Sequence, residues 1–379
     1  MSGATALADQ PARKRKLAER VAERIVSDII QRGWQAGDML GTEADLIERY
    51  GISRATFREA VRQLEWHGAA GMRRGANGGL VVNAPPRLAA IFAIKAYFEF
   101  AGIGSDERKA ASEVLSAAAP FRPGPHENLA IALFLEAADD RTVAALPEQR
   151  QAMGSASKLS ERITLSLVED IRSANAELGT VIGNEADLQQ RFGISRAILR
   201  EALRPLELHD ILRVKAGSQG GVIVHRVDPE YTVGITSTYF TYTRIPLSQT
   251  WEANSSLSLA SAEALLRQDD IPLDRLRSAL EDLQLAGADD YINVAGEFHS
   301  IVANACGNRA IALFTGVLLR YFRDVVPRPD PRFLPDLKNG HRRLLDALET
   351  RDRRAAQIEI AAMFDHSRRW IRKVEAEAE

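Results

Sequence analysis

The sequence predicts a mainly α fold, made of two winged helix-turn-helix domains, each helical with a small β-wing, and an all-α antiparallel helical bundle. Three observations support this fold class. Apolar residues recur at helical spacing along much of the 379-residue chain. One segment returns, without a gap, at an offset of 142 residues. Within each repeat, glycines and capping residues separate two helical stretches and precede a β-branched run.

The composition is that of a globular protein. Hydrophobic residues make up 45% and charged residues 26% of the chain, which excludes wholesale disorder. At roughly 100–200 residues per domain, the length predicts two to four domains. No apolar run approaches the roughly 20 residues of a membrane span, and the basic run 13–16 is not followed by the apolar stretch of a secretory signal. We expect a cytoplasmic protein with no membrane partner and a disordered tail over residues 1–12.

The single cysteine, Cys306, excludes a disulfide framework and a cysteine-based zinc site within one chain. The net charge of −2 gives no overall attraction to nucleic acid, so any such binding depends on where the 49 basic residues lie.

The internal repeat divides the chain. Residues 16–82 and 158–224 are identical at 30 of 67 positions, and the segment 51–55 returns unchanged as 193–197. Chance does not produce this, so the sequence predicts a duplicated domain, over residues 13–84 and 155–228.

Each repeat predicts the same order of elements. An amphipathic helix begins near Leu17 and is stopped by glycines. Thr42 then caps a short helix, the glycine at position 51 makes a tight turn, and Ser53 caps a third helix that ends near His67. Two helices joined by such a turn form a helix-turn-helix. A basic, glycine-rich stretch followed by residues 80–82 predicts a short β-hairpin, the wing.

Basic residues follow one face of the third helix. Arg54, Arg58 and Arg62 are spaced four apart, and the second copy keeps all three. The helix after a helix-turn-helix turn is the one that contacts bases, which favours DNA contact over the alternative of a solvated charged face. The predicted DNA-contacting basic residues are Arg54, Arg58, Arg62, Arg73, Arg74, Arg196, Arg200, Arg204, Arg213 and Lys215. The arm 13–16 either reaches along DNA or is a solvated start to the first helix.

A stretch of about 70 residues separates the copies. Residues 85–154 contain apolar helical patches at 88–100 and 129–138, broken by prolines. They predict a shortened helical connector, a relic of a larger domain; the alternative is a flexible linker.

These motifs resemble the winged helix-turn-helix of the GntR family of bacterial transcription regulators. The family's stretches around the second and third helices correspond to residues 40–46 and 52–61. The resemblance implies that the arginines reach bases or phosphates, and that Ser53, Thr56 and Ser195 make polar phosphate contacts. In the second copy Thr56 is replaced by Ile198, so that contact is lost there.

Residues 229–379 resemble the all-helical FCD effector domain of the FadR subgroup. Such domains bind small carboxylates, often through a metal held by one Asp and three His. Here His299 and His341 match, whereas Ala295 and Met363 stand where further ligands are expected, and His366 is the nearest replacement. The resemblance implies a divalent metal (Zn, Ni or Mn) on these histidines; the alternative is a histidine pair hydrogen-bonded inside the bundle.

Arg320 and Arg323 are candidate anchors for the effector's carboxylate, or else surface ion pairs. The sequence therefore predicts a transcription regulator, a repressor, that binds double-stranded DNA. Its C-terminal domain is expected to sense a small carboxylate and to pair two chains as a homodimer. The alternative is a ligand-independent DNA-binding or architectural factor. No nucleophile elbow, phosphate loop or Ser-His-Asp order supports an enzyme.

Overall fold

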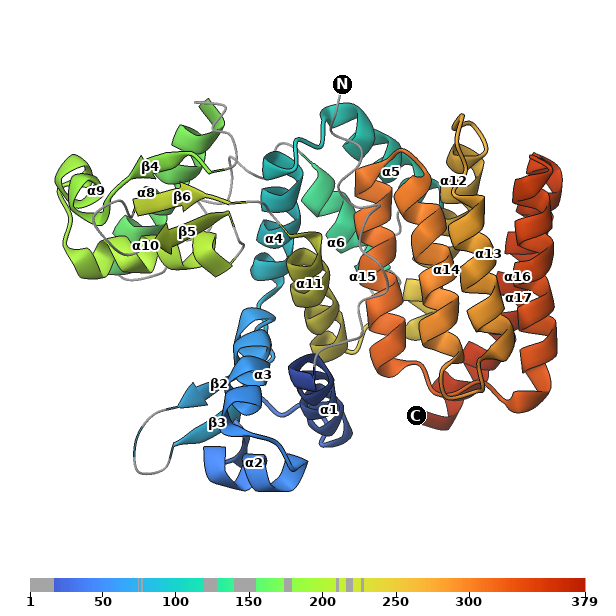
Figure 1. Ribbon diagram of the computed structural model, residues 1–379, viewed down its shortest axis with the longest axis horizontal. Helices are drawn as coiled ribbons and strands as arrows, with labels where there is room; N and C mark the ends of the chain where they lie inside the picture. Colours follow the sequence, from blue (N-terminus) through green and yellow to red (C-terminus); the bar gives the residue numbers. More distant parts are fainter. Residues whose placement is uncertain are drawn as a thin grey trace. The chain divides into compact units, whose positions relative to one another are not determined.

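A computed structural model describes residues 17–73, 75, 78–118, 128–139, 155–173, 179–208, 211–215, 221–225 and 228–378 (Figure 1). Most of these residues lie in α-helices, and the strands form two small antiparallel sheets, so the predicted mainly helical fold is confirmed. The predicted tail 1–12, the basic arm 13–16 and Arg74 lie outside the described residues. No helix in the described part of the chain is long and apolar enough to cross a membrane.

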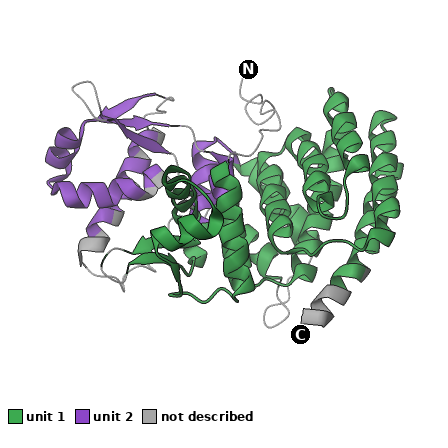
Figure 2. Ribbon diagram, turned by 60° about the horizontal axis from the view of Figure 1, so that its bottom comes forward, with its two compact units in different colours: residues 1–90, 105–135, 233–379 green, residues 91–104, 136–232 purple. Residues whose placement is uncertain are grey.

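The chain divides into two compact units (Figure 2). One unit holds residues 1–90, 105–135 and 233–379, and the other holds residues 91–104 and 136–232. The first helix-turn-helix region therefore belongs to the same unit as the C-terminal helices, whereas the second lies in the other unit. Residues 105–135, predicted as connector, belong to the unit of the C-terminal helices.

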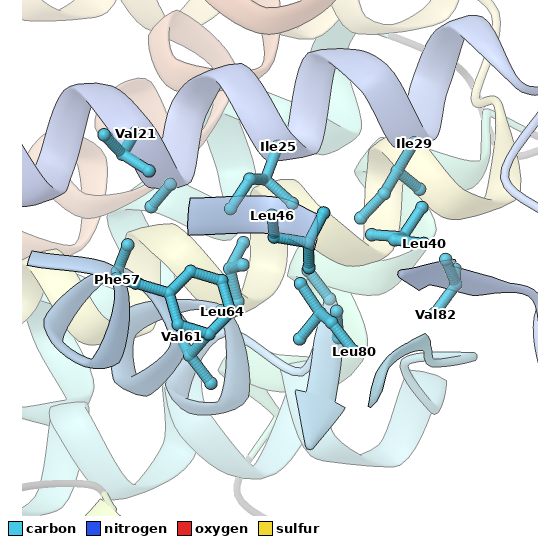
Figure 3. Close-up of a cluster of buried hydrophobic side chains, with 14 of the residues drawn as sticks. Val21, Ile25, Ile29, Leu40, Leu46, Phe57, Val61, Leu64, Leu80 and Val82 are labelled. Atoms are coloured by element: carbon cyan, nitrogen blue, oxygen red, sulfur yellow. The ribbon is translucent and has the colours of Figure 1, made fainter. Parts of the chain in front are cut away.

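The first helix-turn-helix region packs three helices against a three-stranded sheet. Its strand order is β1-β3-β2, with β3 antiparallel to both neighbours. Apolar side chains from all its elements meet in one core, where Ile25, Leu46, Phe57 and Leu80 are almost fully buried (Figure 3). The elements are α1 (Leu17–Gln31), β1 (Met39–Gly41), α2 (Glu43–Tyr50), α3 (Arg54–Trp66), β2 (Ala70–Arg73) and β3 (Gly79–Val82).

Local chemistry sets the turn between α2 and α3. Thr42 caps α2, since its side chain accepts a hydrogen bond from the backbone of Asp45 while the Asp45 carboxylate accepts one from Thr42. Gly51 ends α2 in the left-handed conformation, with φ 62°, which glycine adopts without strain. The side chain of Ser53 then caps α3. These caps fix the angle at which α3 leaves the turn.

The second helix-turn-helix region repeats this arrangement, with strand order β4-β6-β5. The wing register also repeats: Arg73 lies opposite Gly79 in the first region, and Lys215 lies opposite Gly221 in the second. Its elements are α8 (Ser155–Ser173), β4 (Val181–Gly183), α9 (Glu185–Phe192), α10 (Arg196–Leu208), β5 (Leu212–Lys215) and β6 (Gly221–Val224).

Helices make up the rest of the described chain. Between the two regions lie α4 (Arg87–Phe100), α5 (Ser105–Ala118) and α6 (Leu129–Ala138). In the C-terminal part, α12 packs against α14, α15 and α17, and α16 packs against α17 (Figure 1). Phe298, Leu344 and Leu348 are buried in the core of this bundle. Its elements are α11 (Pro229–Thr243), α12 (Leu247–Leu265), α13 (Leu273–Leu285), α14 (Tyr291–Ala305), α15 (Arg309–Val325), a 3-10 turn (Pro331–Phe333), α16 (Leu334–Glu349) and α17 (Arg353–Ala378).

Within the first unit, the loop after α1 contacts α11. The ring of Trp34 meets Tyr242 edge to face, with centroids 6.2 Å apart, and Arg244 donates a hydrogen bond of 2.8 Å to the carbonyl of Gly33. This packing attaches the first helix-turn-helix region to the C-terminal helices.

Candidate nucleic-acid interface and ligand cavity

The structure places two of the predicted arginines of α3 around one carboxylate. The Nε atoms of Arg54 and Arg58 lie 2.9 and 3.3 Å from Oε1 of Glu43, in the first turn of α2. The side chains of the two arginines remain 69% and 63% exposed. Glu43 therefore holds two guanidinium groups in place while leaving them accessible, and the three side chains together carry one net positive charge.

The same cluster stands on α10. The Nε atoms of Arg196 and Arg200 lie 3.0 and 3.5 Å from the carboxylate of Glu185, and the two side chains are 63% and 62% exposed. Sequence reasoning predicted the arginines but missed both glutamates. A signal was available, because each glutamate lies 11 and 15 residues before its arginines in both copies.

The ion pair in the first cluster favours the charged forms of Glu43 and Arg54. The hydrogen bond from Arg54 lowers the pKa of the Glu43 carboxyl, and the same bond raises the pKa of Arg54. Both groups stay ionised at neutral pH. Exposed ion pairs of this kind contribute little stability, so a phosphate can compete with Glu43 for either arginine.

The other predicted DNA-contacting residues have varied surroundings. Ser53 Oγ accepts a hydrogen bond of 3.1 Å from the backbone of Thr56 and lies 2.9 Å from its hydroxyl. Ser195 Oγ accepts one of 3.4 Å from the backbone of Ile198, so both serines act as helix caps. Arg62 forms an ion pair with Glu59. The remaining predicted basic residues that the structure describes are exposed: Arg73, Arg204, Arg213 and Lys215.

The C-terminal bundle encloses a cavity of about 860 Å³. Its walls come from α12, α14, α15, α16 and α17 and the segment before α16. Large apolar side chains line much of it, among them Trp251, Phe322, Phe364 and Trp370. A concave, mostly apolar space with a few polar groups is typical of a small-molecule site.

The two predicted histidines meet in this cavity. Nε2 of His299 lies 3.2 Å from Nε2 of His341, whose Nδ1 is 2.8 Å from the carbonyl of Leu337. Burial lowers the pKa of His299 to about 3 and that of His341 to about 4, so both rings are neutral at pH 7. Because Nδ1 of His341 donates to Leu337, its Nε2 accepts, and Nε2 of His299 is the donor.

The spacing of the two rings can be compared with that of two ligands on one metal ion. Two imidazoles on one tetrahedral ion, with bonds of 2.0–2.1 Å, would hold their nitrogens roughly 3.3 Å apart, close to the observed separation. The cavity wall at Ala295 and Met363 supplies no further His or Asp, and the ring of His366 lies against Phe333 with centroids 5.4 Å apart. Within the described part of the chain, no three His, Cys, Asp or Glu residues cluster as metal ligands. The described residues therefore do not fit a resident metal with a full set of protein ligands.

Other polar groups complete the cavity. Arg328 and Arg332 line it, and they form ion pairs of 2.6 and 2.5 Å with Asp289 and Asp330. Asn254 Oδ1 is buried and accepts no hydrogen bond from the described residues. Asp289 and Asp330 line the cavity as well, so a ligand that fills it can meet two arginines that are paired with carboxylates and one acceptor that needs a donor.

Arg320 and Arg323, predicted as effector anchors, are not among the residues that line the cavity. Arg323 forms ion pairs with Glu23 of α1 and with Asp324, each at 3.5 Å. The positive charge of Arg320 and Arg323 also acts on His67, whose pKa burial lowers well below its ordinary value. These arginines therefore lie where the first helix-turn-helix region contacts the bundle, and the cavity gives the anchor role no support.

Comparison with known families agrees with these features. The profile described as "Bacterial regulatory proteins, gntR family" matches residues 17–79 and again 159–222, and the FCD domain profile matches residues 257–366. The chain contains GntR-family helix-turn-helix regions and an FCD domain. Both resemblances predicted from sequence motifs are confirmed at this level, while membership of the FadR subgroup stays a prediction.

Individual relatives cover parts of the chain. It is 27% identical over 167 residues to the Uxu operon regulator of Haemophilus influenzae, across 42% of this chain and 59% of that protein. It is 28% identical over 204 residues to the HTH-type transcriptional regulator YdhC of Bacillus subtilis, across 50% of this chain and 81% of that protein. The solved structure "Streptococcus agalactiae GntR" matches 55% of this chain and 99% of its own, with 22% identity and a TM-score of 0.44. The two protein relatives are named as regulators and not as enzymes.

Proposed function

We propose that this chain is a transcription regulator that binds double-stranded DNA sequence-specifically through two winged helix-turn-helix domains derived from one duplicated unit. The observation that carries the proposal is the repeated pair of exposed arginines, Arg54 and Arg58 on α3 and Arg196 and Arg200 on α10, each held by a glutamate. A guanidinium group can donate two parallel hydrogen bonds to phosphate oxygens or to the major-groove edge of guanine. The helix after the turn is the one that enters the groove.

The likeness of α3 and α10 predicts two similar half-sites. Eight of the 13 positions of the two helices carry identical residues, including all three arginines. Two similar reading helices favour an operator with two related half-sites, an approximate palindrome if they approach it in opposite senses. Ile198 in place of Thr56 predicts that the half-sites are not read identically.

Selection from a fragmented bacterial genome tests the DNA-binding part of the proposal. Wild-type protein is expected to enrich fragments that share two related half-sites, because both reading helices contribute. The Arg58→Ala/Arg200→Ala variant is expected to lose the enrichment. Arg342→Ala, which removes an exposed arginine from α16, is the matched control and should enrich the same fragments as wild type. Enrichment without any shared pattern, or equal enrichment by the double variant, would contradict the proposal.

The cavity supports a ligand-responsive role, and we place a small carboxylate there. Arg328 and Arg332 can exchange their exposed ion pairs with Asp289 and Asp330 for a ligand carboxylate, and the unsatisfied Oδ1 of Asn254 can accept a hydrogen bond from a donor such as a hydroxyl group on the same ligand. If the ligand binds more tightly to an arrangement that cannot engage DNA, it releases the operator, which is the behaviour of a repressor. A divalent metal (Zn, Ni or Mn) would be held at most by His299 and His341 and is not required by this scheme.

A thermal-shift panel of small carboxylates and hydroxycarboxylates tests this second part. A ligand present at 100 times its Kd stabilises the folded protein by about 2.7 kcal/mol, enough for a clear rise in melting temperature. The rise should be lost in Arg328→Ala and Arg332→Ala, and the same compound should release operator DNA. If no compound shifts the melting temperature while DNA binding persists, the chain is the ligand-independent DNA-binding factor that Ala295 and Met363 also suggest.

A further inference from the structure

The repeat in this chain extends beyond the helix-turn-helix regions. Residues 128–134, at the start of α6, and 308–314, at the start of α15, both read Asn-x-Ala-Ile-Ala-Leu-Phe, with six of seven positions identical. The chain before each of these segments also matches, at the original offset of 142: the stretch from α4 to α5 shares with the stretch from α11 to α12 several residues that are buried in both copies. These are Phe98 matching Phe240, Ile103 matching Ile245, Ala111 matching Ala253, and Leu115 matching Leu257. Tyr97 is also buried, and its match Tyr239 is partly buried.

The matching positions also contact one another reciprocally. Nδ2 of Asn128 donates a hydrogen bond of 2.9 Å to the carbonyl of Gln249, and Nδ2 of Asn308 donates one of 2.9 Å to the carbonyl of Glu107. Glu107 and Gln249 are equivalent at the offset of 142. Each asparagine also caps its own helix, through Oδ1, by accepting a bond from the backbone three residues later.

A second pair of contacts repeats the reciprocity. The backbone N–H of Leu129 donates to Oε1 of Gln249 at 2.9 Å, and the backbone N–H of Arg309 donates to Oε1 of Glu107 at 2.9 Å. Gln249 therefore accepts a hydrogen bond from the start of α6, and its equivalent Glu107 accepts one from the start of α15. Arg309 adds a salt bridge of 2.6 Å from Nη2 to Glu107.

One pair of equivalent residues is in direct contact. The rings of Phe134 and Phe314, matching residues of the repeat, stack with centroids 4.3 Å apart and planes inclined by 19°. A residue meets its own equivalent only on a two-fold axis, and an interface in which i contacts j while j contacts i is isologous. Such an interface normally joins two copies of one chain. Here both halves belong to the same chain and to the same compact unit.

We infer that residues 105–118 and 128–135 belong to the remnant of a second C-terminal domain, and that they occupy, within the same chain, the surface through which two such domains would pair. The offset rises from 142 to 180 between α5 and α6, so the remnant is 38 residues shorter than its counterpart between these points. The segment lost includes the counterparts of α13 and of α14, which carries His299. The remnant has kept the pairing surface and lost this wall of the cavity.

One chain then forms, by itself, the pair of domains that would otherwise need two chains, and the pairing surface of its C-terminal domain is not accessible to a second chain. This replaces the homodimer through the C-terminal domain that the sequence predicted. The inference goes beyond the proposed function and does not depend on it, since it rests on packing alone. Contact within one chain avoids the loss of translational and rotational freedom that association of two chains would cost.

Reversing the charges of the Glu107–Arg309 ion pair, either within one chain or on two different chains, tests the inference with full-length protein. Glu107→Arg and Arg309→Glu each place like charges at the 2.6 Å contact, and each is expected to lower the melting temperature by several degrees. The double variant E107R/R309E should regain at least half of the loss. A mixture of the two single variants, unfolded and refolded together, should regain none, because the contact forms within a chain. Light scattering should give the mass of one chain, 41.7 kDa.

Arg343 and Glu359 provide a matched control. They form an ion pair of 2.7 Å between α16 and α17, away from the reciprocal contacts, and its reversal should leave the mass unchanged. Recovery in the mixed sample would overturn the inference, since only a contact between two chains can be restored by mixing. A mass of two chains, or single variants with an unchanged melting temperature, would also overturn it.

Discussion

Acid should destabilise the cavity through the histidine pair. The two imidazoles have an ordinary pKa of 6.5 in the unfolded chain, and burial lowers the folded values to about 3 for His299 and about 4 for His341. As the pH falls through 6.5, the two imidazoles bind protons in the unfolded chain but stay neutral in the folded chain. The pair therefore contributes its full stability above pH 6.5 and loses it progressively as the pH falls toward 4.

The expected loss between pH 7 and pH 5 is about 2 kcal/mol for each ring, or about 4 kcal/mol together. The free energy of unfolding in urea, followed by the fluorescence of Trp251 and Trp370 in the cavity wall, measures it. Other acid-sensitive groups are shared with the variant His299→Gln/His341→Gln, so the difference between the two proteins isolates the pair. Wild type should lose about 4 kcal/mol more than the variant. Equal losses would refute the assignment of two buried, neutral imidazoles.

Three further changes have defined outcomes. Gly79→Ala should destabilise the first winged region by roughly 1–3 kcal/mol, because its Cβ would lie 2.5 Å from the carbonyl oxygen of Gly41; thermal unfolding followed by circular dichroism measures this, and an unchanged melting temperature would contradict it. Ser53→Ala should cost about 1 kcal/mol by removing the cap of α3, whereas Ser53→Asp should retain most of the stability in the same assay. Added Zn²⁺ should raise the melting temperature only slightly, and not at all in His299→Gln; tight binding that survives this substitution would show that the metal binds elsewhere.

Much of the helix-turn-helix regions could be predicted because local chemistry determines them. The caps at Thr42 and Ser53 and the left-handed glycine at position 51 are encoded within a few residues. The spacing of the arginines follows from the helix alone. Glu43 escaped notice because its contact with Arg54 spans the turn and depends on the angle between two helices.

The remainder depends on packing between distant segments. The spacing of apolar residues indicated helices at 88–100 and 129–138, and these residues lie in α4 and α6, but the spacing carries no information about what a helix packs against. The match between Asn128 and Asn308 was missed because the offset changes from 142 to 180 where 38 residues are absent. The meeting of His299 with His341 followed from the resemblance. The same resemblance could not show that His366 lies against Phe333.

The salt dependence of operator binding by wild type, Arg58→Ala, Arg200→Ala and the double variant shows most directly whether both winged regions read DNA. The two side chains are equally exposed, at 63% and 62%, so each single change should weaken binding by a similar amount, about 1–3 kcal/mol. If the two arginines contact phosphates, each substitution should lower the slope of log K against log salt by about 1, and the double variant by about 2. One single variant that binds like wild type would show that its winged region does not read DNA. If both single variants bind like wild type, neither winged region reads DNA through these arginines, and the proposed function is wrong.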